Sequence, residues 1–182
     1  ITTVTNGSLA VTVSGSTSVA DINTINADSA TGIVTATVTS AAASVLKGLQ
    51  TDSNDAITMT VNAEASSAAT LAADLVLLNG NTNQVITMTA VTKVSGSYAD
   101  LLDVYVTNAG QYNGEGDEAV TITGTVTAAQ ADAIADVTSG VVTATIDEAT
   151  AAALNAALSH AQENAYNLTI NGSNAISTDI TS

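Results

Sequence analysis

Two segments of this chain, AVTVSGSTSVADINTI at residues 10–25 and AVTITGTVTAAQADAI at residues 119–134, match one another at a separation of 109 residues (119 − 10). A second pair follows at a separation of 108: GIVTATVTS at residues 32–40 and GVVTATIDE at residues 140–148. Self-similarity at a nearly fixed separation is the sequence signature of a repeat architecture. The chain is therefore expected to build one structural unit twice.

The repeat divides the 182 residues into three parts. Residues 1–109 form the first copy and residues 119–182 a second, partial copy. Between them, residues 110–118 form an acidic, glycine-rich connection, GQYNGEGDE, which we expect to be a surface excursion or a joint between the copies.

Each copy alternates short runs of two different periods. Runs of alternating apolar and polar residues are typical of half-buried strands, and they occupy residues 10–14, 33–39, 57–62, 85–90, 119–123, 141–146 and 166–171. Segments rich in Ala, Leu and Asp lie between them and are predicted to be helices, at residues 19–28, 41–50, 68–79, 98–108, 128–137 and 149–162. Three of these helices begin with the spacing of a capping box, namely Ser18 with Asp21, Ser97 with Asp100, and Thr127 with Gln130.

The predicted strands are one-sided. At residues 34–39, Val34, Ala36 and Val38 alternate with three threonines, and the other strands repeat this pattern. Strands buried on both faces of a doubly wound sheet would instead be continuously apolar. Strands joined through helices should also be parallel, with right-handed connections. We therefore expect an α/β repeat solenoid of short parallel strands, with helices on one face and a threonine-rich exposed face.

The threonine face is the candidate binding surface. Its members are Thr35, Thr37, Thr58, Thr60, Thr87, Thr89, Thr121, Thr123, Thr143 and Thr145. Threonine is also common on exposed strand faces for reasons of strand geometry alone. Regular Thr-x-Thr rows on parallel strands resemble the ice-binding faces of some β-solenoid antifreeze proteins, and sheet-to-sheet stacking between copies is another use of such a face.

Composition and charge exclude several classes of function. The chain has 17 acidic residues and two basic ones, Lys47 and Lys93, which gives a formal net charge of −15. Two lysines cannot supply the contacts that a phosphate backbone or an anionic membrane surface requires, and the sequence holds no apolar run of membrane-spanning length. Without cysteine, disulfides and thiolate metal sites are excluded. Self-association with copies of the same protein is the partner that we expect.

Calcium is the one cofactor that the sequence suggests. Two acidic loops each gather several oxygen ligands, which hard cations prefer. The first loop contains Asp52, Asn54 and Asp55, and the second contains Glu115, Asp117 and Glu118. Solvated turns in an anionic protein explain the same residues without a metal.

Catalytic chemistry is not expected. His160 is the single histidine, and with no cysteine, arginine or second histidine it lacks the partners of a nucleophilic or histidine-metal site. The carboxylates are scattered over predicted loops and helix starts, where the helix dipole favours acids without any functional role. We therefore predict that the chain is not an enzyme.

Four strings carry a family resemblance: SGSYADLL at residues 95–102, EAVTITGTVTAAQADAI at residues 118–134, GVVTATI at residues 140–146 and AADLVLLNGNT at residues 72–82. They resemble the Ala/Thr/Val-rich repeats of very large secreted cell-surface proteins of cyanobacteria and other aquatic bacteria. The resemblance implies an extracellular, S-layer-like, sheath or adhesin role. The alternative, which comes from the Thr-x-Thr strand face, is a ligand- or ice-binding module. The resemblance carries over no catalytic residue.

Overall fold

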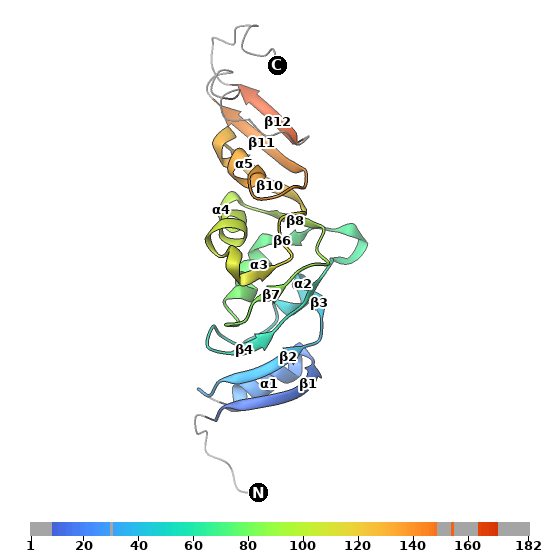
Figure 1. The fold of residues 1–182 in the computed structure, drawn as a ribbon, viewed down its shortest axis with the longest axis vertical. Helices are drawn as coiled ribbons and strands as arrows, with labels where there is room; N and C mark the ends of the chain where they lie inside the picture. Colours follow the sequence, from blue (N-terminus) through green and yellow to red (C-terminus); the bar gives the residue numbers. More distant parts are fainter. Residues whose placement is uncertain (1–8, 30, 149–153, 155–163, 171–182) are drawn as a thin grey trace, which may run out of the picture.

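The computed structural model describes residues 9–29, 31–148, 154 and 164–170, and it is a mixed α/β structure (Figure 1). Figure 1 shows its strands lying across the long axis of the molecule, from β1 near one end to β12 near the other. Every strand pairing among the described residues is parallel. The predicted fold class is confirmed to that extent.

The described strands are short and are connected through helices or turns. They are β1 (Val11–Thr17), β2 (Val34–Val38), β3 (Ala41–Ala42), β4 (Ala56–Thr58), β5 (Val61–Asn62), β6 (Thr70–Leu71), β7 (Ile86–Thr87), β8 (Lys93–Gly96), β9 (Tyr112–Asn113), β10 (Ala119–Val126), β11 (Val142–Glu148) and β12 (Ala165–Ile170). The helices are α1 (Val19–Ser29), α2 (Ala43–Leu46), α3 (Ala72–Asn79), α4 (Tyr98–Leu102) and α5 (Ala128–Ala135), with shorter turns η1 (Ala65–Ser67), η2 (Asp103–Thr107) and η3 (Ala109–Gln111).

Two ladders of strands account for most of the pairing. One has the order β1-β2-β4, and the other has the order β12-β11-β10-β8-β6. Two further pairs, β3-β5 and β7-β9, and an isolated bridge from Thr60 to Thr87 stand outside the two ladders. Neighbouring strands in a ladder follow one another at 20 to 30 residues in the sequence, because a parallel pairing needs a crossover connection.

The core is a continuous cluster of small aliphatic side chains. It includes Ile22 of α1, Ile57 of β4, Met59 just after β4, Leu75 of α3 and Ile146 of β11, each without solvent exposure. The chain has no phenylalanine and no tryptophan, so the helices pack close to the strands through Ala, Val, Leu and Ile.

Two glycines show that the aligned segments have the same backbone. Gly15 in β1 and Gly124 in β10 both have φ of +82°, a conformation that costs residues with a side chain more than it costs glycine. The pairing of β1 with β2 shifts register between Thr12 and Ser16, and that of β10 with β11 shifts between Thr121 and Thr125. The same bulge therefore occurs twice, 109 residues apart.

A second pair of glycines marks a close approach of the chain to itself. A Cβ atom on Gly32 would lie 1.9 Å from the carbonyl oxygen of Leu9, and one on Gly140 would lie 2.1 Å from that of Glu118. Both distances are far inside van der Waals contact, so the backbone of the preceding strand can approach only because these positions lack a side chain.

Polar side chains in three turns accept hydrogen bonds from the amides of strands earlier in the chain. Just before β4, the Oδ1 atom of Asp55 accepts a 2.7 Å hydrogen bond from the amide of Val34, and just before β12, Asn164 accepts one of 2.9 Å from the amide of Val142. In the turn before β7, the hydroxyl oxygen of Thr82 accepts from the amide of Ile57 at 3.0 Å. These bonds satisfy strand-end amides that would otherwise be buried without a partner.

Several local expectations are confirmed and others are wrong. The caps of α1, α4 and α5 form as predicted, with Thr127 and Gln130 making a complete capping box. The predicted helix at residues 41–50 is shortened to α2, and the strands β3, β6, β8 and β9 were not predicted. The predicted helix at residues 149–162, including His160, lies outside the described residues apart from Leu154, which is helical.

The connection at residues 110–118 is more than a surface excursion. It contains β9, which pairs with β7, and both Tyr112 and Glu118 are buried. The hydroxyl of Tyr112 donates a 3.1 Å hydrogen bond to the carbonyl oxygen of Leu75 in α3. An acidic, glycine-rich composition predicted exposure here, whereas strand pairing and packing bury Tyr112 and Glu118 within the segment.

Candidate functional site

The predicted threonine face has its side chains on the outside. Among its members, Thr35, Thr37, Thr58, Thr89, Thr121, Thr123 and Thr143 are exposed, while Thr60, Thr87 and Thr145 are partly buried. The apolar residues that alternate with them, such as Val34, Ala36 and Ile57, are buried. The sidedness predicted from the sequence is thus present at these positions.

The register aligns only part of the threonines. Thr37 lies beside Ser16 on one side and Thr58 on the other, and Thr60 lies beside Thr87. In the second ladder, Thr121 lies beside Thr143, and Thr145 beside Thr125. Other rows are interrupted, because Thr35 pairs with Ala56 and Thr87 with Asn113. No pairing is seen for Thr89 or Thr123 among the described residues, and Thr123 lies at the Gly124 bulge.

In the first calcium candidate, the carboxylates accept hydrogen bonds from backbone amides. Asp55 is buried and accepts from the amides of Val34 and Asp52, while Asp52 accepts a 2.7 Å bond from the amide of Asn54. These residues line one side of a polar cleft of about 410 Å³. Within the described part of the chain, no three histidine, cysteine, aspartate or glutamate side chains form a group that could hold a metal ion. Calcium binding stays a prediction.

The second calcium candidate contains a buried carboxylate. Glu118 has no solvent exposure, and its Oε2 atom accepts from the amide of Gly116 at 2.8 Å and from the hydroxyl of Tyr105 at 3.2 Å. Its Oε1 atom is buried without a hydrogen-bond partner. Burial therefore raises the pKa of Glu118 above its ordinary value, and burial together with the nearby Glu118 charge raises the pKa of Tyr105.

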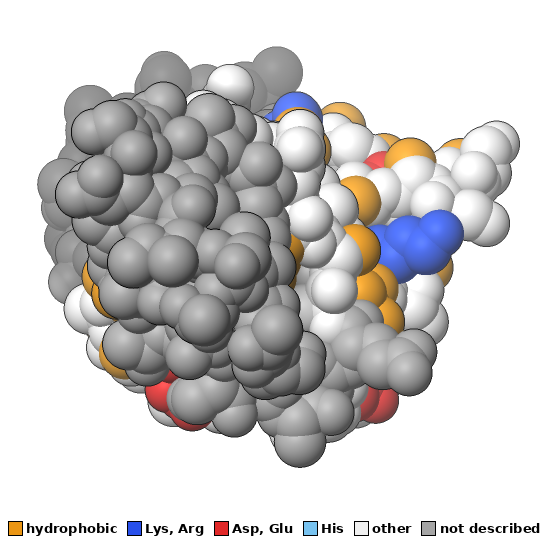
Figure 2. Space-filling view, turned by 90° about the horizontal axis from the view of Figure 1, so that it is seen from above, with side chains coloured by type: hydrophobic (Ala, Val, Ile, Leu, Met, Phe, Trp, Pro, Cys, Tyr) orange, Lys and Arg blue, Asp and Glu red, His pale blue; other side chains and the backbone are white. Residues whose placement is uncertain are grey.

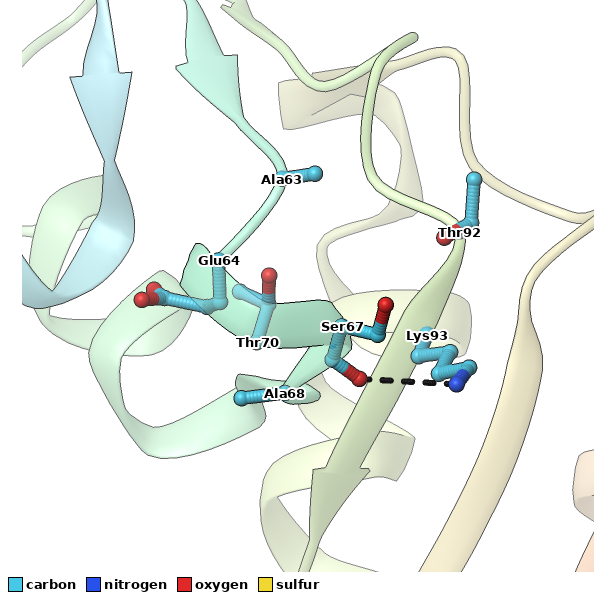
Figure 3. Close-up of a pocket in the computed structure, with 7 residues that line it drawn as sticks. All are labelled: Ala63, Glu64, Ser67, Ala68, Thr70, Thr92 and Lys93. Atoms are coloured by element: carbon cyan, nitrogen blue, oxygen red, sulfur yellow. Dashed lines mark hydrogen bonds between the residues drawn. The ribbon is translucent and has the colours of Figure 1, made fainter.

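Sequence reasoning did not identify a small polar pocket beside β8 (Figure 3). It has a volume of about 160 Å³ and lies between the segment that joins β5 to β6 and the start of β8. The residues that line it are Ala63, Glu64, Ser67, Ala68, Thr70, Thr92 and Lys93. The sequence predicted a helix over residues 68–79, which gives Thr70 no neighbouring strand. The pocket between Thr70 and β8 therefore could not be predicted.

Thr70 occupies a core position of the sheet. The register places it beside Val94, which lies beside Val120, which in turn lies beside Val142. Thr70 is 1% exposed, and its hydroxyl oxygen has no hydrogen-bond partner. Figure 3 shows this hydroxyl turned toward the space between Ala63 and Ser67. A buried hydroxyl without a partner is unusual in a folded protein and requires an explanation.

The wall of the pocket carries one cation and a strained turn. The ammonium group of Lys93 donates to the carbonyl oxygen of Ser67 at 3.4 Å (Figure 3). Ser66 and Ser67 have φ of +57° and +60°, the left-handed region that residues other than glycine seldom occupy. Glu64 is bound elsewhere, since its two carboxylate oxygens accept from the amide and the hydroxyl of Ser44 near the start of α2.

Comparisons with known proteins add no relative. No family model, no curated protein and no solved structure matches the chain. Over the described residues, no helix combines the length and the apolar character needed to cross a lipid bilayer.

Proposed function

We propose that this chain is a structural repeat module of a large extracellular, cell-surface protein of bacteria, of the S-layer-like, sheath or adhesin kind. In this proposal it is a one-layered solenoid of parallel strands, with helices on one face and threonines on the other. The observation that carries the proposal is the recurrence of one backbone unit at both ends of the molecule, with the Gly15 bulge repeated at Gly124 and the Gly32 contact repeated at Gly140.

A stack of this kind suits a spacer or scaffold for a physical reason. Each strand pairs with its neighbours along the long axis, so adding further units lengthens the stack without changing its cross-section. Acid and amide side chains, such as those of buried Asp55 and half-buried Asn164, join successive strands. The polar interior of this chain therefore supports its architecture.

Self-association through the terminal strands is part of the same proposal. Among the described strands, β1 pairs only with β2, and β12 only with β11. In β1, the amide of Val11 donates to the carbonyl oxygen of Ile33. Because amides alternate in direction along a strand, the amide of Thr12 points to the opposite edge. An unpaired strand edge is a template for pairing with another chain.

Two measurements test the proposal. Small-angle scattering should give a radius of gyration above the roughly 16 Å of a compact globule of this length, and sedimentation should show association that grows with concentration. Thr12→Pro removes the outward amide and should abolish the association, whereas Thr12→Val, which keeps the amide, should not. A monomer at all concentrations, or equal association of both variants, would contradict association through β1.

A binding module is the second candidate function, and the aligned rows of Ser16, Thr37 and Thr58 and of Thr121 and Thr143 favour it. Its ice-binding version predicts thermal hysteresis in the wild-type chain and a loss of it in a Thr37→Tyr, Thr121→Tyr double variant, since both positions are exposed. A wild-type chain without hysteresis would end that version.

A further inference from the structure

We propose that the pocket beside β8 binds a small oxyanion group, a carboxylate or a sulfate, with Thr70, Ser67 and Lys93 as its hydrogen-bond donors. The site lies at the edge of the second ladder, where β6 pairs on one side with β8. It is independent of the scaffold role, because neither strand stacking nor the threonine face depends on its occupancy.

The hydroxyl of Thr70 is the first observation that points to a ligand. The three positions aligned with Thr70 along the core row are valines, and valine has the shape of threonine without the hydroxyl. Packing therefore gives no reason for a threonine at this position. The hydroxyl has no partner in the protein and is turned toward the pocket, so an acceptor atom placed there would complete its hydrogen bonding.

Lys93 supplies the charge. Its ammonium group has three donors and makes one long hydrogen bond, to Ser67. The ion pair found among the described residues joins the other lysine, Lys47, to Asp74. Seen from the C-terminal end, the described surface carries few basic side chains, which lie among hydrophobic and uncharged ones (Figure 2). Lys93 thus keeps donors available for an anion.

The strained turn fixes the geometry of the site. Two consecutive residues of left-handed conformation, Ser66 and Ser67, persist only where the surrounding structure determines them, and such residues cluster at ligand sites. Here they bring the carbonyl group of Ser67 to Lys93 and place the serine on the wall of the pocket. The turn therefore holds Ser67 against Lys93 in the lining of the cavity.

Size and charge limit the ligand. A volume of about 160 Å³ is that of roughly five water molecules, so the pocket takes acetate, sulfate or one edge of an acidic sugar. Glu64 also lines the pocket, but its carboxylate is turned away from Lys93 and accepts hydrogen bonds from Ser44, so the ligand presents its anionic group to Lys93 (Figure 3). The shared chemistry is an oxyanion, either free in solution or carried by an acidic polysaccharide.

The test is a titration of the ¹⁵N-labelled full chain, followed by NMR, with acetate, sulfate, glucuronate and a polyuronate. Ionic strength is held at about 0.15 M with sodium chloride, because the net charge of −15 repels anions and salt screens this repulsion beyond about 8 Å. For so few ligand atoms we expect a dissociation constant on the order of 1 mM. Amide shifts should be confined to Ser67, Thr70, Thr92 and Lys93.

Matched variants identify the donors. Lys93→Gln should weaken binding at least tenfold, and Lys93→Arg should restore most of it. Thr70→Val should weaken binding several-fold, whereas Thr121→Val, the same change on the exposed face, should leave it unchanged. Tighter binding of glucuronate and polyuronate than of acetate would identify a saccharide as the source, and equal binding would identify the free anion.

Two results would overturn the proposal. One is the absence of saturable shifts at these four amides up to 50-fold above the expected dissociation constant. The other is an equal loss of binding in Lys47→Gln and Lys93→Gln, since that would show a general effect of net charge instead of a contact in the pocket. The spectrum of each variant shows whether it is folded before the titration begins.

Discussion

Replacing Thr70 by valine is predicted to make this protein more stable. Thr70 is a core residue of β6, aligned with Val94, Val120 and Val142, and 1% of its surface is exposed. Valine fills the same space, and the substitution removes a buried hydroxyl whose oxygen has no hydrogen-bond partner. The substitution therefore removes no hydrogen bond that the folded protein makes.

The size of the effect follows from the cost of desolvating that hydroxyl. A buried polar group left without a partner costs about 1–3 kcal/mol. The free energy of unfolding should therefore rise by about 1–3 kcal/mol in Thr70→Val. For a chain of this length, 1 kcal/mol shifts the melting temperature by about 2–4 °C, so the expected increase is about 2–12 °C.

Two other threonines provide controls with different expected signs. Thr82 is also buried, but its hydroxyl contacts the amide and carbonyl groups of Ile57 and the amide of Gln84 at 2.8 to 3.0 Å. Thr82→Val leaves these groups unpaired and should lower stability by about 1–3 kcal/mol. Thr121 is exposed, and Thr121→Val should change stability by less than about 0.5 kcal/mol.

Urea unfolding followed by far-ultraviolet circular dichroism measures all three variants. The midpoint should shift with an unchanged slope, which shows that stability and not compactness has changed. A Thr70→Val variant that is destabilised to the same degree as Thr82→Val would refute the reasoning, because it would mean that the hydroxyl of Thr70 has a partner in the folded protein.

Three further predictions concern the repeat, a buried acid and calcium. Gly15→Ala and Gly124→Ala should each lower the free energy of unfolding by about 1–2 kcal/mol, the penalty of a left-handed residue with a side chain. Gly140→Ala should lower it by more than about 3 kcal/mol, because its Cβ meets a backbone carbonyl. Urea midpoints measure these losses, and equal losses at all three positions would contradict the prediction. Because the pKa of Glu118 is raised above 4.5, the folded state binds its proton more tightly than the unfolded state does, so the contribution of this group to stability is full below pH 4.5 and declines as the pH rises through the raised pKa. The difference in free energy of unfolding between wild type and Glu118→Gln should therefore grow with pH across that range. A difference that stays constant would be inconsistent with a raised pKa. Saturating Ca²⁺ should raise the melting temperature above that in excess EGTA if it binds the native state, and identical values would remove both acidic loops as calcium sites.

The sequence predicted the parts of the fold that depend on local pattern. Alternation of valine with threonine over residues 34–38 correctly gave β2 its buried and exposed sides. Capping spacings correctly placed the starts of α1, α4 and α5. Both signals are local, because strand alternation and helix capping involve residues only a few positions apart.

The short strands and the pocket could not be predicted in this way. A two-residue strand such as β6 has no detectable period. The sequence of residues 68–79 therefore predicted one helix, whereas the structure has the strand β6 directly before the helix α3. The register of β6 beside β8 is set by packing against a strand more than 20 residues away. The opposite side-chain directions of Thr70 and Leu71, inward for the polar residue and outward for the apolar one, follow from that register alone.

By itself, the sequence determined that the chain carries the same unit twice and that its strands have one apolar and one hydroxyl-bearing side, because these properties depend on spacings along the chain. Only the tertiary structure decided which side chains meet across strands: the Thr70 hydroxyl in a row of valines, Lys93 beside the turn at Ser67, and the carboxylate of Glu118 in the interior. The physical reason is that burial and hydrogen bonding of these groups are set by neighbours distant in sequence, whose register no local pattern specifies.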